Sequence, residues 1–486
     1  MATAAPSEIM QTLAAYKAAV APLPGQGALS PDISKAWNIA SGLQAYNLEA
    51  LHSLFPVLTP IRNATSRVKG KGKKVEYKTI TGINTTGLQG LVAEGSAASI
   101  VTTATVDKTA TYKSLALGDT VTFESEWSGL GFVDLKALAV TNLLRAVMQV
   151  EENLLLFGQA ATAAAAEQAP GAVGASPQPA LTGNASGGSI AAATYYAKQT
   201  AITGMGESLP SAATAVAVGG TGAGSITWTP VFPAGQPVIG FNLYLSTTSG
   251  GTYYLVASAN VAASRSSGQL PGGSLTWLTN GDALTVTSIP AAGTTAPAAD
   301  ASGNDLSYNG IYTQMWGGSG ATLVNAGGAL TVAAITSVLQ KLWNSARGDP
   351  DAIYCNAQES VKLTGLTLGA GAPYQVLLTQ DQVGQAAANF RVARFTNPVT
   401  GTELPIIVHP TVPQGTMLFL QKKLPGWYVP TDVPTVWEWD GPQDYVEIDY
   451  PPTSSNPLWQ AEVRAYGALK LYLPLLQGAL YGINNQ

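Results

Sequence analysis

The chain has 486 residues, including 52 glycines and 30 prolines, and only 11% of its residues are charged. Soluble enzymes usually carry about 25% charged residues, so this low value predicts a surface that neighbouring subunits largely cover. The net charge of −5 excludes a strongly basic nucleic-acid-binding protein, and the single cysteine, Cys355, excludes a disulfide framework and a cysteine metal cluster.

No signal peptide or membrane span is expected. The first twenty residues lack a basic start followed by an apolar core. The longest apolar segment, 135–157, is interrupted by Lys136, Arg145, Glu151 and Glu152, whereas a span needs about 18 residues nearly free of charge. These features predict a soluble cytosolic protein that makes no membrane contact.

Residues 1–60 are predicted to form an arm with helical stretches at 7–19 and 32–54, separated and ended by proline and glycine. Alternating patterns then predict strands at 74–80 and 109–115. The intervening stretch, 81–108, is too long for a loop inside a compact domain. We therefore expect it to become ordered against another subunit.

Residues 133–158 give the clearest helix, with Asp134 as its N-cap. Apolar residues occupy nearly its whole circumference, which predicts burial on several sides. Linkers rich in alanine, glycine and proline are expected at 159–189 and 290–302.

The segment between these linkers, about 190–290, contains seven predicted strands, which is typical of a β-sandwich. The strands are expected at 194–202, 212–218, 225–229, 240–245, 253–256, 274–278 and 283–287. The expected interior residues are Tyr195, Ile202, Trp228, Phe241, Leu243, Tyr254 and Trp277.

From residue 303 onward the pattern is mixed. Helices are predicted at 330–345 and 357–363, with Gly365 as the stop signal of the second. Strands are predicted at 351–355, 404–409, 417–420 and 461–473.

Motifs that carry chemistry are largely missing from the sequence. The two histidines, His52 and His409, form no metal motif, and the glycine-rich stretch 219–224 precedes no helix. Glu151 and Glu152 are adjacent and so face different ways on a helix. The sequence therefore predicts no catalytic, cofactor or metal site.

One basic cluster and one acidic segment stand out as candidates for contacts between subunits. The cluster is either a solvated strand face or a basic band that faces an acidic neighbour or DNA phosphates. Its sparse aromatic content gives no reason to expect base stacking. The basic residues are Arg62, Arg67, Lys69, Lys71, Lys73, Lys74 and Lys78, and the acidic residues are Asp440, Asp444, Glu447 and Asp449. The acidic group could also hold a cation, but a solvated or inter-subunit face is the better explanation.

The order of these elements resembles that of the major capsid proteins of tailed bacteriophages. Residues 58–63 with 67–72 look like the start of the family's E-loop, and 151–158 look like the end of its spine helix. Residues 310–311, 351–356 and 463–467 look like a Gly-Ile step, an A-domain segment and the closing P-domain strand. The resemblance covers about 55–158 and 305–480, and the order of the segments carries it.

This resemblance implies an α+β fold: the tailed-phage major capsid fold with an inserted all-β sandwich. The expected parts are an N-terminal arm (1–60), the E-loop with P-domain strands (61–126, E-loop about 70–118), the spine helix (127–160), the insertion with its linkers (161–300), a mainly A-domain part (301–430) and closing P-domain strands (431–486). The insertion resembles immunoglobulin or fibronectin type III modules with a rearranged strand order.

The implied function is a structural head shell, icosahedral or prolate, built from hexamers and pentamers around double-stranded DNA. The resemblance implies a separate scaffolding protein, a portal, decoration proteins, weak non-specific contact with DNA, and an insertion that decorates the exterior. Assembly is expected in the host cytoplasm and the final location in the virion capsid. The predicted E-loop tip, 87–98, contains no lysine, so cross-linking through a tip lysine is not expected.

Two alternatives remain at this point. An encapsulin-like compartment would share the fold but enclose protein cargo. A secreted carbohydrate-binding or carbohydrate-active β-sandwich protein would need a signal peptide and a catalytic carboxylate pair, and neither is found in the sequence.

Overall fold

The computed structural model describes residues 58–483 except 84–90, 98–102, 130–133, 162–170, 221, 260–283, 291, 318, 369–391, 427–434 and 452–457. The predicted N-terminal arm up to residue 57, His52 and the predicted strand at 274–278 therefore lie outside the described residues. The chain divides into two compact units, a smaller one that includes Leu117–Arg145 and Glu447–Val463, and a larger one that includes Val57–Ala116, Ala146–Val446 and Arg464–Gln486.

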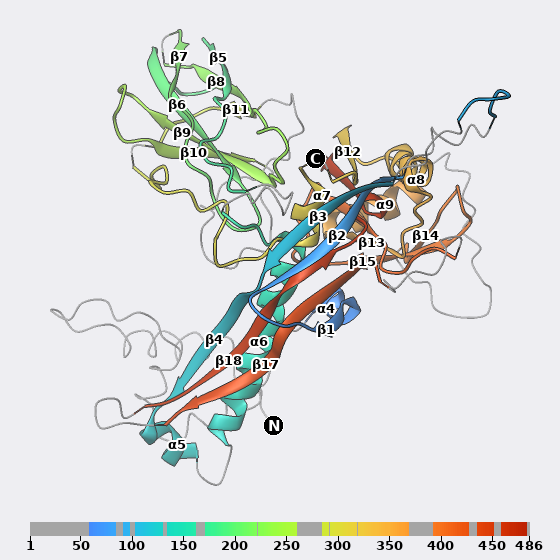
Figure 1. Ribbon diagram of the computed structural model, residues 1–486. Coiled ribbons are helices and arrows are strands. Elements are labelled where there is room, and N and C mark those ends of the chain that lie inside the picture. Colours follow the sequence, from blue (N-terminus) through green and yellow to red (C-terminus); the bar gives the residue numbers. More distant parts are fainter. Residues whose placement is uncertain are drawn as a thin grey trace, which may run out of the picture. The chain divides into compact units, whose positions relative to one another are not determined.

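The larger unit begins with the short helix α4 (Pro60–Ala64) and strand β1 (Ser66–Lys69), which lead into a long hairpin (Figure 1). The hairpin consists of β2 (Lys74–Ile83) and β3 (Thr103–Thr111), paired antiparallel from Lys74↔Thr111 to Ile83↔Thr103. The predicted loop 81–108 was therefore too long, because both strands continue into it. The predicted strand at 109–115 is divided at Tyr112, where β3 ends and β4 (Lys113–Val121) follows.

Strands β1, β17 (Trp437–Tyr450), β18 (Trp459–Leu471) and β4 form a four-stranded sheet in that order. β1 pairs in parallel with β17, with Arg67 opposite Trp439. Only β18 was foreseen as a strand among the two long C-terminal ones. The strand β17 was not predicted because its acidic residues interrupt the alternation of apolar and polar side chains.

Helices α5 (Phe123–Gly129) and α6 (Leu135–Phe157) follow β4 in the chain. Asp134 caps α6 as predicted, since its Oδ1 accepts hydrogen bonds from the N–H groups of Lys136 and Ala137 at 3.1 and 3.2 Å. The predicted burial on several sides is right at the C-terminal end, where Leu155 and Leu156 are fully buried. It is wrong nearer the middle, where Leu144 and Val150 are exposed.

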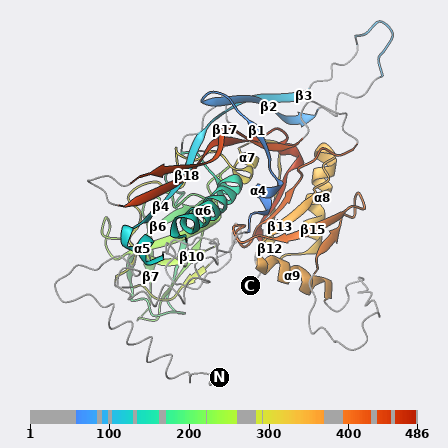
Figure 2. The same ribbon diagram turned by 90° about the horizontal axis from the view of Figure 1, so that it is seen from below.

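A six-stranded mixed sheet forms the second main part of the larger unit, in the order β12-β19-β16-β13-β15-β14 (Figure 2). Its strands are β12 (Thr322–Gly328), β13 (Ala352–Cys355), β14 (Arg394–Thr396), β15 (Glu403–Val408), β16 (Met417–Leu420) and β19 (Gly478–Ile483). The helical elements of this region are α7 (Ile311–Met315), α8 (Val332–Ala346), α9 (Ala357–Leu368) and the 3-10 turn η2 (Pro474–Leu476). α9 runs through Gly365, so this glycine does not stop the helix as expected.

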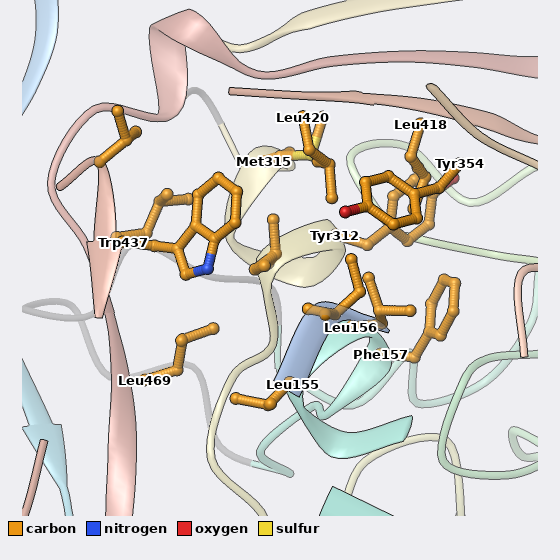
Figure 3. Close-up of a cluster of buried hydrophobic side chains, with 14 of the residues drawn as sticks. Leu155, Leu156, Phe157, Tyr312, Met315, Tyr354, Leu418, Leu420, Trp437 and Leu469 are labelled. Atoms are coloured by element: carbon orange, nitrogen blue, oxygen red, sulfur yellow. The ribbon is translucent and has the colours of Figure 1, made fainter. Parts of the chain in front are cut away.

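The short strands of this sheet are buried on both faces. In β16, Met417 and Phe419 join a core with α8, whereas Leu418 and Leu420 join a second core around the end of α6. Figure 3 shows this second core, in which Leu155, Leu156 and Phe157 of α6 surround Tyr312 and Met315 of α7. The continuous apolar run of β16 follows from this burial, because both faces of a covered strand need apolar side chains.

Seven strands between residues 180 and 286 form two further sheets. The order β10-β9-β6-β7 comprises Tyr254–Ala259, Gly240–Ser246, Ala193–Ile202 and Thr214–Val218, and the order β11-β8-β5 comprises Leu284–Val286, Ser225–Thr229 and Ala180–Asn184. Six predicted strands are confirmed. β5 lies inside the stretch that was predicted to be a linker, which corrects the lower boundary of the strand-rich segment.

The strand-rich segment has its own core, but two predicted interior residues lie elsewhere. Tyr195, Trp228, Phe241 and Leu243 are buried in it as expected. Ile202 instead joins the core around the end of α6, and Tyr254 is half-buried, next to the buried Tyr253. Trp277 lies outside the described residues.

Candidate assembly site at the base of the hairpin

The two consecutive glutamates at the end of α6 occupy different buried sites, as expected from their adjacency on a helix. Each side chain is 1% exposed. A buried carboxylate is costly unless it is paired and hydrogen-bonded, so the partners of each one explain its presence in a largely apolar helix. Together these partners connect α6 to the segment that leads into the hairpin.

Glu151 is held by two arginines and a tyrosine. Arg67 Nη2 lies 2.6 Å from both carboxylate oxygens, and Arg62 Nε lies 3.1 Å from Oε2. The hydroxyl of Tyr445 donates to the same Oε2. Both guanidinium groups also stack near the ring of Tyr445, at 4.9 and 5.1 Å from its centre. Partners within the same subunit therefore largely neutralise the positive charge of the arginines.

Burial and charge shift the pKa values of this cluster in a consistent direction. Burial lowers the pKa of Arg67, but the combined effect of Glu151, Tyr445 and Asp444 is larger, so the net pKa lies above the ordinary value. Burial, and then Glu151, raise the pKa of Tyr445 well above the usual range. The arginine stays charged and the tyrosine stays a hydroxyl donor across the physiological pH range.

Glu152 fixes the short helix α4 and the chain before it. Its oxygens accept the backbone N–H groups of Ile61 at 2.8 Å and Arg62 at 2.6 Å. Oε1 also lies 2.6 Å from Nε2 of His409, which is fully buried. The N–H of Thr411 points at Nδ1 of that ring, so Nδ1 accepts and the ring proton sits on Nε2, where it donates to Glu152. His409 is thus a structural hydrogen-bond donor.

A second buried ion cluster lies under the turn into the hairpin. Lys470 Nζ is 2.8 Å from Asp440 Oδ2 and also bonds to Glu438. The hydroxyl of Tyr112 donates to Asp440 Oδ1 at 2.7 Å. A Cβ at Gly70 would lie 2.1 Å from that oxygen, so only glycine lets the turn pass this close to it. Burial, and then the hydrogen bond to Asp440, raise the pKa of Tyr112 to about 12.

The lysines of the basic cluster behave differently from the arginines. Lys69, Lys71 and Lys73 are exposed, and no ion pair to them occurs within the described residues. Lys74 pairs with Glu76 at 2.5 Å and Lys78 with Asp107 at 3.7 Å, both on the hairpin and both exposed. We call residues 68–73, which comprise the end of β1 and the turn into β2, the lysine turn.

The predicted acidic partners also separate into two kinds. Asp440 is buried, where it pairs with Lys470 and accepts the hydrogen bond of Tyr112. Asp444 pairs with Arg67 at 2.5 Å. Glu447 and Asp449 are exposed. The structure therefore brings part of the basic cluster and part of the acidic segment together, but within one chain.

The paired strands of the hairpin are anchored on the subunit, whereas the described residues 91–97 beyond them are exposed. The N–H of Ile80 donates to the carbonyl of Tyr472 at 3.0 Å, and the ring of Tyr77 lies edge-on to the ring of Tyr472. Among residues 91–97, Leu91 is 94% exposed. A two-stranded hairpin is marginally stable alone, so its outer half needs a partner surface.

Sequence reasoning missed the internal partners of the cluster, above all His409, Tyr445 and Lys470. One signal was available: Glu151 and Glu152 stand together in a helix segment whose other residues are mostly apolar. Buried charges rarely occur without partners, and that rule could have predicted that arginines were bound there. Which arginines bind depends on the parallel pairing of β1 with β17, which no local pattern reports.

Among the described residues, no group of three histidine, cysteine, aspartate or glutamate side chains is arranged to hold a metal ion. Within the same residues, no helix is both long enough and apolar enough to cross a membrane.

Residues 251–428 match the family model described as SU10 major capsid protein. This match spans just over a third of the chain and supports a structural capsid shell protein. Shell proteins of this family are not enzymes, so the match argues against the carbohydrate-active alternative. No protein of curated function matches the sequence.

Solved capsid structures resemble this capsid protein over most of their length. The capsid of a native GTA particle covers 91% of this chain and 99% of its own, at 7% identity and a TM-score of 0.40. The match to the capsid of cyanophage A-1(L) covers 88% of this chain and 94% of that one, at 12% identity and a TM-score of 0.39. The match to an encapsulin from Synechococcus elongatus covers 94% of this chain and 97% of that one, at 8% identity and a TM-score of 0.35. With identities and TM-scores this low, the family match carries the assignment.

Proposed function

We propose that this capsid protein assembles, as hexamers and pentamers, into the head shell that encloses the double-stranded DNA of a tailed phage. The exposed outer half of the β2–β3 hairpin carries this proposal. It projects apolar residues, Leu91 and Val92, that have no core of their own. A neighbouring subunit supplies the surface that such a hairpin needs.

Shortening the hairpin tests this role directly. Residues 84–102 are replaced by a two-residue Asn-Gly turn, which leaves β2, β3 and the anchoring contacts of Ile80 and Tyr77 intact. The expected product is a folded, soluble subunit that forms no shells in negative-stain microscopy. A matched control replaces only Leu91 and Val92 by serine. Normal shells from the shortened protein would show that the hairpin is not the assembly arm.

The contents of the shell separate the phage reading from the encapsulin alternative. Particles purified from infected cells are expected to contain double-stranded DNA, which they would hold through weak, salt-sensitive contacts. Treating opened particles with nuclease and weighing the nucleic-acid fraction checks this. Particles that contain one protein cargo and no DNA would favour the encapsulin alternative. Scaffolding, portal and decoration proteins are proposed to co-purify with particles isolated early in infection. Isolating these early particles from the host cytoplasm tests the proposed place of assembly.

We also propose that the seven-stranded segment, about 175–300, is an inserted immunoglobulin-like module on the outer face of the shell. Its separate core, with Trp228 and Phe241 at the centre, supports an independent module. Its attachment is tighter than flexible linkers would make it. Ile202 and Ile239 pack in the core around the end of α6, and Gly204 lies against Phe157, where a Cβ would come within 2.3 Å of Phe157 Cβ.

These contacts change how the module should be tested. Excision of 165–300 would remove Ile202 and Ile239 from the main core, so it would disturb the rest of the subunit as well. An epitope tag in the exposed turn 247–250 leaves the fold intact. Antibody binding to intact particles is expected. Binding only after particles are broken open would place the module inside the shell and refute the exterior assignment.

A further inference from the structure

Two aromatic side chains are exposed on the short helix α5. Phe123 is 50% and Trp127 is 63% exposed, and their ring centres lie 4.6 Å apart. An exposed pair of this size on a soluble subunit marks a surface that another molecule covers. The pair is four residues apart, so both rings lie on one side of the helix.

This aromatic pair stands in strongly acidic surroundings. Glu124 and Asp119, on α5 and the adjoining strand β4, are exposed. Lys136 pairs with Glu126 at 2.7 Å and lies 5.6 Å from the ring of Trp459, so that lysine is already engaged. Within the described part of the smaller unit, seven carboxylates stand against two basic residues: Asp119, Glu124, Glu126, Asp134, Glu447, Asp449 and Glu462 against Lys136 and Arg145. A partner should therefore be basic with a small apolar contact.

The lysine turn has that chemistry. Val68 is 41% exposed and is followed by the exposed Lys69, Lys71 and Lys73. The turn is also held in shape, since Gly70 is fixed against Asp440 and Tyr112 and its N–H donates to the carbonyl of Gly441 at 3.0 Å. A rigid turn loses little conformational entropy on binding.

We propose that the lysine turn of one subunit docks on the Phe123–Trp127 face of a second copy of this chain. Val68 covers the aromatic rings, a lysine ammonium lies over the Trp127 ring, and Glu124 and Asp119 pair with the other lysines. The contact joins two different surfaces, so it repeats from copy to copy and can close into rings. It rests on the proposed self-assembly and names one contact within it.

Charge distinguishes the lysine turn from another exposed apolar candidate, the hairpin tip at residues 91–97. The tip carries Leu91 and Val92 but only one charged residue among 91–97, Glu94. A carboxylate would be repelled by the acidic surroundings of the aromatic pair. The lysine turn brings attraction instead, which also gives the contact a salt dependence.

A charge exchange between subunits tests the proposal. One variant carries Lys69→Glu, Lys71→Glu and Lys73→Glu, and the other carries Asp119→Lys and Glu124→Lys. Each variant alone is expected to give about a tenfold lower shell yield at about 0.1 M salt, because like charges meet at the contact. Mixing the two, or combining all five changes in one chain, should restore the yield, since opposite charges then face each other again.

Two further measurements keep the outcome decisive. The melting temperature of each unassembled variant should equal that of the wild type, because all five residues are exposed. Single variants Lys71→Cys and Glu124→Cys, mixed before assembly and oxidised, should give a disulfide-linked dimer that neither gives alone. The native Cys355 is buried and does not interfere.

Failure of this contact and failure of the proposed function look different. Normal shells from both charge variants, or no rescue on mixing, would overturn the docking while leaving shell assembly intact. A wild-type chain that never forms shells would overturn the proposed function itself.

Discussion

The two halves of the basic cluster at residues 62–78 differ in their surroundings. Arg62 and Arg67 bind the buried Glu151, whereas Lys69, Lys71 and Lys73 remain in solvent. The difference follows from chemistry as well as position. A guanidinium is planar, weakly hydrated and able to bond both carboxylate oxygens, so it is the cheaper cation to bury beside a carboxylate. A run of like charges in a sequence is thus not one functional unit.

Lys470 shows that this division is not a fixed rule about lysine. Its ammonium is nearly buried, but two carboxylates, Glu438 and Asp440, face it. Burial lowers the pKa of Lys470, and the bonds to these carboxylates together with Tyr472 more than offset the decrease, so the pKa is raised overall. Among the residues that the structure describes, no such pair of carboxylates faces Lys69, Lys71 or Lys73.

The largest expected effect comes from breaking the arginine half. Glu151→Ala leaves Arg62, Arg67 and the Tyr445 hydroxyl without their shared acceptor. Breaking a buried pair by removing one partner costs about 3 kcal/mol or more. Urea unfolding of the unassembled subunit measures the loss. Glu403→Ala, which breaks only the exposed pair with Arg394, should change stability little.

A smaller loss is expected at the neighbouring carboxylate. Glu152→Gln keeps the shape of the side chain but replaces one acceptor oxygen by an NH₂ group that faces a backbone N–H or the His409 ring. One buried donor then loses its partner, at a cost of about 2 kcal/mol. Thermal unfolding should show the decrease. Glu124→Gln, at an exposed glutamate, serves as the control, and an equal effect from both would refute the buried role.

The effect of Tyr112→Phe on the stability of the subunit should depend on pH. Removing the hydrogen bond to Asp440 is expected to cost about 1 kcal/mol near pH 7. The pKa of Tyr112 is raised from 10.0 to about 12, so its contribution is complete below pH 10 and is lost as the pH rises through about 12. The stability difference between wild type and variant should therefore shrink over that range. Tyr450→Phe, at an exposed tyrosine, should show no such trend.

The smallest effect on the subunit is expected from the lysine half. Replacing Lys69, Lys71 and Lys73 by alanine should change the free energy of unfolding by less than about 0.5 kcal/mol, because exposed charges contribute little to stability. Shell yield should nevertheless fall. A large loss of subunit stability would mean that these lysines belong to the same internal network as the arginines.

Patterns with a short repeat were predictable from the sequence. The helix α6 with its Asp134 cap, the buried strands β13 and β16, and most strands of the inserted segment follow from apolar periodicity and turn residues. Errors occurred where long-range packing decides the outcome. α9 continues through Gly365, and β5 forms within a stretch whose composition is typical of linkers.

The sequence by itself determined that the chain is a low-charge, mixed α+β protein with one basic cluster, one acidic segment and no motif for catalysis. Tertiary structure alone decided how those charges are used. The parallel pairing of β1 with β17 brings Arg67 to Asp444 and Glu151, and the return of β18 brings Lys470 to Asp440. These partners lie up to several hundred residues apart in the chain, and a charge has no periodicity that reports its partner. Only the fold therefore distinguishes the paired, half-buried arginines from the exposed lysines.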